Sequence, residues 1–452
     1  MEGNRHPRFG DELGTINLSA IQKNQVNVTM ASSTKFENLP TEILDLIANE
    51  NLDINDAENL RQASKQFRDV VDLKKDKWKC VNYIKNANNL TERCENGDFS
   101  EEEKICQRKH NLCGPLNVKA SVSLPQVTVP YGTTWVGKKT FSNINIRRFH
   151  IVLPKTVKNI DTEAFKRNTN VVKVSAPGVE KVQDNAFVKC TSLEVFEAPK
   201  LKEIGKRAFG KCALKSFHGP LVTSIGHKSF YFSQRLKTIK FPTLKIIEND
   251  AFSNCESLQT ADFPKVLGIG ERAFNFCLYL RDFKAPQAQY IDDEAFGACE
   301  SLQTVDLPQV REIYGAAFTC CDKLEEFQGP LLEIISAAAF EFCPKLKRVY
   351  APEVYDIGYN AFSECYDLEK FNGPRLKHIG SLAFLRCKSL ETVWAPFVRS
   401  IEDGAFQGCL NLRQITISEK TEIGKDAIPT HTKVIFIENL MYPTVSINGY
   451  TF

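Results

Sequence analysis

Small and apolar residues recur along this chain at a fixed interval. The marker of the repeat is the dipeptide Ala-Phe, which returns every 22 residues. Its phenylalanines are Phe165, Phe187, Phe209, Phe252, Phe274, Phe296, Phe318, Phe340, Phe362, Phe384 and Phe406. Ser229-Phe230 fills the one gap, after a deletion before Leu214 that shortens this step to 21 residues. Because so regular a period indicates one unit repeated and stacked, the pattern predicts a solenoid.

Each coil of the repeat contains one predicted strand. A typical coil reads Leu-x-x-φ-x-x-Pro-x-Leu-x-x-Ile-x-x-x-Ala-Phe-x-x-Cys-x-x, as in Leu302 to Lys323. In its first part, residues 302, 305 and 307 should point inward, and residues 304 and 306 outward. Pro308 ends the strand because a proline nitrogen cannot donate to a sheet. Each coil therefore adds one short strand to a parallel sheet, and neighbouring coils must stack to bury their apolar residues.

The coil resembles the BspA-type leucine-rich repeats, whose units carry Ile-Gly-x-x-Ala-Phe-x-x-Cys-x-x-Leu and a strand that ends in proline. Ile204-Gly205, Ala208-Phe209, Cys212 and Leu214 through Pro220 match this pattern in order. The resemblance covers roughly residues 150 to 430. It implies an α/β leucine-rich-repeat solenoid of about 12 coils, and it is nearly silent on function.

A different pattern occupies residues 36 to 79, where apolar residues at helical spacing predict three short helices. The segment opens with Leu39-Pro40-Thr41-Glu42-Ile43-Leu44 and continues with Leu60-Arg61-x-x-Ser64-Lys65-x-Phe67-Arg68. It resembles the F-box, the adaptor-binding module of cullin-RING ubiquitin ligases. The resemblance implies a surface that docks on a Skp-type adaptor, formed by Leu39, Pro40, Ile43, Leu44 and Ile47. The alternative is that these five residues form the core of an ordinary helical cap on the solenoid.

These patterns predict five segments. They are an extension at 1–35 without periodicity, an F-box-like helical module at 36–80, a linker and N-terminal cap at 81–150, the solenoid at 151–430 and a C-terminal cap at 431–452. Thr140-Phe141, 24 residues before Phe165, is a worn copy of the Ala-Phe pair within the third segment.

Charge and hydropathy narrow the classes of partner. The chain has 58 basic and 55 acidic residues, a net charge of +3, so neither a nucleic-acid patch nor a membrane-binding basic signal is indicated. No stretch is apolar enough to span a membrane, and the polar N-terminus lacks the apolar segment of a signal peptide. We therefore expect a protein of the cytoplasm or nucleus of a eukaryotic cell, which could be a host cell.

Ten of the 15 cysteines stand three residues after a repeat phenylalanine. They are Cys190, Cys212, Cys255, Cys277, Cys299, Cys321, Cys343, Cys365, Cys387 and Cys409. Stacking would place them in single file, one to each coil, so we interpret them as reduced, buried residues of a tight turn rather than as zinc ligands or redox groups. Cys94, Cys106, His110 and Cys113 form the other candidate zinc set, but their spacing matches no known motif. No cofactor or metal is expected.

The outward residues of the strands are the candidate binding positions, because they vary without disturbing the core. In the C-terminal half these positions bring together the side-chain types that dominate interface energies. They are Arg348, Tyr350, Lys370, Asn372 and Trp394. In the middle of the sheet, Lys240, Asp262, Lys284 and Asp306 alternate in sign, which we interpret as a ladder that stabilises itself modestly.

The two resemblances together suggest an F-box substrate receptor, which holds a Skp-type adaptor and a cullin at one end and an unknown target protein on the concave sheet. Such a receptor has no catalytic residue of its own. The alternative is a BspA-like adhesin or protein-binding scaffold without a role in ubiquitin transfer. A repeat protein that is itself a ligase would need a catalytic domain, and only about 25 residues follow the last coil.

Overall fold

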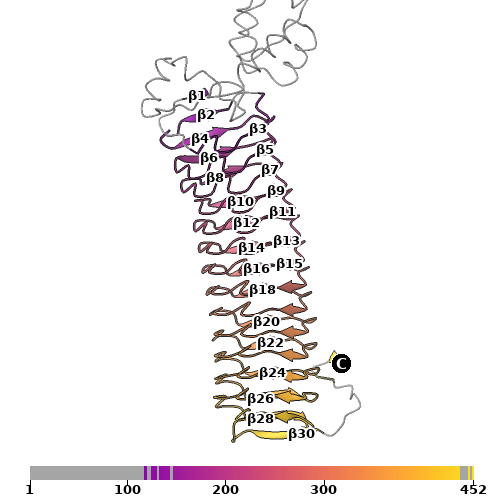
Figure 1. The fold of residues 1–452 in the computed structure, drawn as a ribbon. Coiled ribbons are helices and arrows are strands. Elements are labelled where there is room, and N and C mark those ends of the chain that lie inside the picture. The colour runs from indigo at the N-terminus through magenta and orange to yellow at the C-terminus, as the bar shows by residue number, and fades with distance from the viewer. Residues whose placement is uncertain are drawn as a thin grey trace, which may run out of the picture. The chain divides into compact units, whose positions relative to one another are not determined.

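The computed structural model describes residues 117–119, 124–129, 132–142, 146–437, 446–447 and 450–451. These residues form strands, turns and bends, with no helix among them. The coils follow one another along a single axis, as the order of the strands in Figure 1 shows.

Two rows of strands run along the stack. We call the first the long-strand row. It consists of β2 (Gln126–Thr128), β4 (Phe149–Val152), β6 (Val171–Ser175), β8 (Val195–Glu197), β10 (Ser216–His218), β12 (Thr238–Lys240), β14 (Thr260–Asp262), β16 (Asp282–Lys284), β18 (Thr304–Asp306), β20 (Glu326–Gln328), β22 (Arg348–Tyr350), β24 (Lys370–Asn372), β26 (Thr392–Ala395), β28 (Gln414–Ser418) and β30 (Lys433–Ile437). The expected alternation is confirmed at Leu302 and Leu307, which are buried, and at Thr304 and Asp306, which are exposed, whereas Val305 is half-buried.

The second row consists of two-residue strands that end at the isoleucine, or at its valine equivalent, of each coil. We call it the short-strand row. It consists of β3 (Trp135–Val136), β5 (Asn159–Ile160), β7 (Lys181–Val182), β9 (Glu203–Ile204), β11 (Ser224–Ile225), β13 (Ile246–Ile247), β15 (Gly268–Ile269), β17 (Tyr290–Ile291), β19 (Glu312–Ile313), β21 (Ile334–Ile335), β23 (Asp356–Ile357), β25 (His378–Ile379), β27 (Ser400–Ile401) and β29 (Glu422–Ile423). The sequence indicated the buried isoleucine but not the strand that carries it.

Strands within each row are parallel, and hydrogen-bonded neighbours pair in register except for a shift at Phe149–His150 between β4 and β6. The long-strand row falls into three hydrogen-bonded groups, divided between β8 and β10 and between β18 and β20, and the short-strand row divides between β11 and β13. Antiparallel pairs occur only at the ends of the described chain. There β1 (Asn117–Lys119) pairs with β2, and β31 (Ser446–Ile447) pairs with β32 (Tyr450–Thr451).

A column of stacked phenylalanine rings fills the centre of the solenoid. Thirteen rings, from Phe141 to Phe406, follow one another with neighbouring centroids 4.6–5.4 Å apart. All are fully buried, as are the alanines before the repeat phenylalanines. The column starts at Phe141, so a coil already exists within the segment where we expected the N-terminal cap.

The turn that carries Ala-Phe replaces the helix that an α/β solenoid would have. Residues two before and two after the phenylalanine have positive φ in coil after coil, as in Asn185 and Lys189 (56° and 63°) around Phe187. Such left-handed residues cannot continue a right-handed helix. The turns are nevertheless hydrogen-bonded from coil to coil. The N–H of each repeat phenylalanine donates to the carbonyl of the residue at the alanine position of the next coil, at 2.7–2.9 Å.

Two parts of the expected fold are therefore corrected. The α/β class is wrong for the described residues, which form an all-β parallel solenoid. The count of about 12 coils is also too low, because the stack makes about 14 turns. The additional turns come from coils such as 126–142, which lack the Ala-Phe marker. The predicted helical module at 36–80 lies outside the described residues.

Candidate binding surfaces

The structure brings the five predicted target-binding residues together on the outer side of the long-strand row. Arg348 and Tyr350 lie on β22, Lys370 and Asn372 on β24, and Trp394 on β26. Arg348 pairs in register with Lys370, and Asn372 with Trp394. We call this group the C-terminal face. Tyr350 is 49% exposed, and Trp394 is half-buried.

The two ends of the C-terminal face differ in character. On the β20 side, the Arg348 guanidinium forms an ion pair with Glu326. On the other side, Trp394 pairs in register with Thr416, which pairs with Ile435 of β30. Thr416 is only 7% exposed, although it belongs to the outer side of the sheet. Large side chains therefore flank and cover a small polar one, which makes the Trp394 end more apolar than the Arg348 end.

Of the other residues singled out in the sequence, the four mid-sheet charges lie on the long-strand row, and the rest lie outside the described residues. Lys240, Asp262, Lys284 and Asp306 do lie opposite one another in register. Within the described part of the chain, these four make no ion pair with one another, so their mutual stabilisation is at most that of exposed charges. The predicted adaptor-binding residues Leu39, Pro40, Ile43, Leu44 and Ile47 lie outside the described residues, as do Cys94, Cys106, His110 and Cys113.

A polar cluster near the N-terminal end of the long-strand row escaped the sequence analysis. His150 Nε2 lies 2.9 Å from Ser175 Oγ, and the Ser175 hydroxyl donates to the Glu197 carboxylate at 2.9 Å. Glu197 also forms an ion pair with Lys173 at 2.7 Å. Burial and Lys173 lower the pKa of His150, and the Lys173 ammonium lowers that of Glu197. Because the serine proton goes to the carboxylate, His150 must donate to the hydroxyl. A serine nucleophile needs the reverse direction.

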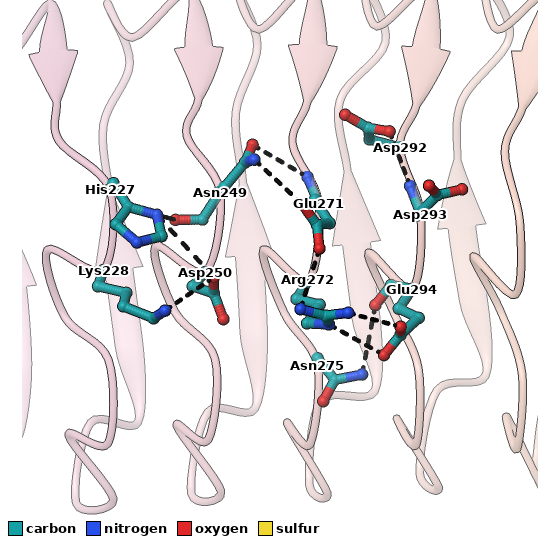
Figure 2. Close-up of polar contacts among 10 residues, drawn as sticks. All are labelled: His227, Lys228, Asn249, Asp250, Glu271, Arg272, Asn275, Asp292, Asp293 and Glu294. Atoms are coloured by element: carbon teal, nitrogen blue, oxygen red, sulfur yellow. Dashed lines mark hydrogen bonds and ion pairs between the residues drawn. The ribbon is translucent and has the colours of Figure 1, made fainter.

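A second network joins neighbouring coils next to the short-strand row. Figure 2 shows the Arg272 guanidinium between Glu271 and Glu294, and it contacts these carboxylates at 2.9 and 3.0 Å. Asn249 accepts from the Glu271 N–H at 3.2 Å, and Asp293 in the same way accepts from Gly315 at 2.7 Å. Side chains at this position therefore bind the backbone of the next coil, which is a structural role.

The ten cysteines of the repeat form a buried column, as expected. Each Sγ donates to the carbonyl of the phenylalanine one coil earlier at 3.0–3.4 Å. Ser233 Oγ and Asn168 Nδ2 make the same bond in coils without the cysteine, at 2.9 and 2.7 Å. Burial raises the pKa of the Cys255 thiol to about 12. The described residues contain no group of histidine, cysteine or acidic residues placed to hold a metal ion.

No helix that could cross a membrane is found in the described part of the chain. The repeat pattern, the parallel strands and the buried cysteine column together match one known family. Six copies of the BspA-type leucine-rich repeat region match residues 119–215, 202–325 and 311–435, well over half of the chain. This chain belongs to the BspA-type leucine-rich repeat family. Repeats of this family are typical of non-enzymatic protein-binding scaffolds, and no catalytic family is indicated.

One solved structure shares the fold of this chain at a TM-score of 0.50, and a second is similar at a lower score. A leucine-rich repeat protein from Bacteroides ovatus is 21% identical and aligns with 71% of this chain and 98% of its own, with a TM-score of 0.50. The pneumococcal vaccine antigen PcpA is 19% identical over 73% of this chain and 92% of its own, with a TM-score of 0.44. At these identities the likeness concerns the fold alone. No curated protein matches the chain in sequence.

Proposed function

We propose that this chain is a non-enzymatic protein-binding scaffold whose C-terminal face holds a target protein. The observation that carries the proposal is the placement of Tyr350, Asn372 and Trp394 on three adjacent strands of a rigid sheet. Aromatic side chains on a rigid support lose little conformational entropy on binding and offer a large contact area, and they are enriched among the residues that dominate interface energies.

The charged and polar residues of the C-terminal face could form the polar rim of an interface centred on Tyr350 and Trp394. Lys370 and Asn372 are exposed, and Arg348 is already held by Glu326. An arginine whose rotamer is fixed in the free protein loses less entropy when it binds a carboxylate. The face therefore has aromatic anchors at Tyr350 and Trp394 and hydrogen-bond donors at Arg348, Lys370 and Asn372 beside them.

The test requires a partner captured by crosslinking to the full chain and then purified. Tyr350→Ala and Trp394→Ala should each weaken binding at least about tenfold, because truncation of a true anchor commonly costs about 2 kcal/mol or more. Thr260→Ala is the matched control, since Thr260 is exposed on the same row on β14. The binding site would lie elsewhere if both aromatic variants bind with unchanged affinity and substitution of the mid-sheet charges weakens binding. Those charges are Lys240, Asp262, Lys284 and Asp306.

A second candidate function rests on the sequence of residues 36–79. We infer that this segment binds a Skp-type adaptor and, through it, a cullin, so that the solenoid presents its target for ubiquitin transfer. The order of Leu39-Pro40, Ile43-Leu44 and Leu60 to Arg68 supports this assignment. The assignment also proposes a location in the cytoplasm or nucleus, where a thiol column would stay reduced. Neither proposal includes a nucleic acid, a membrane or a cofactor.

Co-purification distinguishes the two candidates. The full chain and its Leu39→Ala, Pro40→Ala double variant are incubated with a purified Skp-type adaptor. We expect the adaptor to follow the unchanged chain and not the variant, with the same circular dichroism for both. Equal adaptor binding by the two proteins would remove the F-box assignment and leave the scaffold proposal intact.

A further inference from the structure

A group of apolar side chains is exposed on the short-strand row, on the part of the solenoid that spans β13 to β19. Ile246, Leu267, Tyr290 and Tyr314 are each between 37% and 46% exposed. They come from four successive coils. Ile246 and Tyr290 lie on β13 and β17, where Gly268 of β15 is the register partner of both, while Leu267 directly precedes β15 and Tyr314 directly follows β19. An exposed apolar group of this kind on a rigid sheet is typical of an interaction site.

The Tyr290 ring occupies space that is open only because the neighbouring strand has a glycine at the facing position. Gly268 is its register partner on β15, and a Cβ at Gly268 would lie only 2.1–2.5 Å from the Tyr290 ring. The ring therefore lies across the backbone of β15, and Gly268 is buried beneath it. A ring that packs against backbone on one face has less conformational freedom to lose when a partner binds.

Carboxylates flank the apolar group: Glu248 follows the end of β13, Asp292 and Asp293 follow the end of β17, and Glu312 begins β19 opposite Tyr290. Glu248, Asp292, Asp293 and Glu312 lie on these coils, and none of the four makes an ion pair among the described residues. Their neighbours are different, because Glu271 and Glu294 share Arg272, and Asp250 contacts Lys228 at 3.4 Å (Figure 2). Glu312 instead accepts from the Tyr314 hydroxyl, and that hydrogen bond, burial and the charges of Glu312, Asp292 and Asp293 raise the Tyr314 pKa.

The opposite flank of the apolar group has two basic residues, Lys245 and Arg311. Arg311 is already paired with Glu333 on the next coil, with its Nη1 2.5 Å from the carboxylate. Lys245 is exposed and makes no ion pair among the described residues. The field over this surface is therefore negative on the side of Asp292 and Asp293, and the other side keeps the single positive charge of Lys245. Such a field repels the phosphates of nucleic acids and of anionic membranes, and it favours cationic side chains.

We propose that this surface, formed by Ile246, Leu267, Tyr290 and Tyr314 with their acidic flank, docks a lysine- or arginine-rich peptide segment of a partner protein. Apolar side chains of the segment pack against Tyr290 and its neighbours, and its cations face Asp292, Asp293 and Glu312. This docking does not depend on the function proposed for the C-terminal face, since the two surfaces lie on different rows of strands.

The probe for this docking is a fluorescein-labelled peptide of about twelve residues that alternates lysine and leucine, and its binding to the full chain is followed by fluorescence anisotropy. Tyr290→Ala should weaken binding by about tenfold. The double variant Asp292→Asn, Asp293→Asn should weaken it several-fold and reduce its dependence on salt, because it removes charge and keeps the hydrogen-bond acceptors. Tyr350→Ala should leave it unchanged.

Three results would overturn the proposal. They are no binding of the lysine-leucine peptide, equal binding of a glutamate-leucine peptide of the same length, and unchanged affinity in both variants. Leu267→Asn is the second apolar variant, since Leu267 is exposed and its replacement opens no cavity in the core. It should weaken binding with an unchanged melting temperature. A loss caused by Tyr350→Ala would instead assign the peptide to the C-terminal face.

Discussion

The cysteine of the repeat has a role that its size alone does not explain. Its thiol donates to the carbonyl of the repeat phenylalanine one coil earlier, and Ser233 and Asn168, which replace the cysteine in two coils, are also donors. This position therefore requires a short side chain with a hydrogen-bond donor. The sequence shows the small size, but the acceptor lies one coil away and becomes visible only when the coils are stacked.

Ser229 is the opposite case, a donor without an acceptor. It replaces the alanine of the Ala-Phe pair, its side chain is fully buried, and its hydroxyl has no hydrogen-bond partner. We expect Ser229→Ala to stabilise the protein by about 1 kcal/mol, because a buried unsatisfied hydroxyl costs roughly 1–3 kcal/mol. The measurement is the midpoint of urea denaturation. Ala251→Ser, at the same place in the next coil, should lower that midpoint, and a lower midpoint for Ser229→Ala would contradict the argument.

At the scale of the element, the turn around Ala-Phe is built from left-handed residues that are mostly not glycine. Ala298 has a φ of 55°, in the same turn as the buried Ala295. An L-residue in this region costs roughly 1–2 kcal/mol relative to glycine. Gly404 and Gly408 show the unstrained solution in one coil, with φ of 64° and 78°.

Glycine should therefore have opposite effects at two positions of one turn. We expect Ala298→Gly to raise the melting temperature, because it removes strain of about 1 kcal/mol. Ala295→Gly should lower it, because its backbone is not left-handed and glycine adds conformational entropy to the unfolded chain. Thermal unfolding by circular dichroism compares the two variants. Destabilisation of similar size in both would mean that the left-handed conformation carries no strain.

The strand of each coil was predictable because Leu302, Val305 and Leu307 alternate with polar residues and Pro308 ends the run. The turn was not, since residues such as Lys189, Phe276 and Ala298 give no sign of a positive φ. The short-strand row was also missed, because two residues are too few for an alternating pattern. The same limits apply to the surfaces. Alternation placed Tyr350 and Trp394 on one side, whereas the position of Tyr290 depends on Gly268 in another coil.

At the scale of the whole molecule, the thiol column links stability to pH. Burial raises the pKa of eight of the ten ladder thiols above the ordinary value of 9.0. The unfolded chain releases these protons first, so stability is fully present below about pH 9 and falls as the pH rises toward the folded pKa values. Each thiol contributes a loss of up to about 1.4 kcal/mol per pH unit. We expect the melting temperature, measured with a reductant, to fall steeply between pH 9 and 10.5.

Lysine and tyrosine side chains also titrate in this range, so a matched variant is needed. Serine can replace the thiol, as Ser233 shows, and it does not ionise. A variant with serine at Cys255, Cys277, Cys299 and Cys321 removes four of the eight thiols with a raised pKa. Its thiol-dependent loss of stability between pH 9 and 10.5 should therefore be about half that of the unchanged chain, whatever its stability at pH 7. The same alkaline loss in both proteins would show that the column is not responsible.

The direction of the bonds between coils also determines how the molecule responds to force. Hydrogen bonds between parallel strands and between turns run along the stack, so tension applied to its two ends pulls directly on them. Because the load is parallel to these hydrogen bonds, we expect them to break one coil after another. Strands pulled along their own length would instead have to break all their hydrogen bonds at once. Each coil then releases 22 residues, which extend to roughly 70 Å. We therefore expect the solenoid to lengthen in nearly equal steps under load.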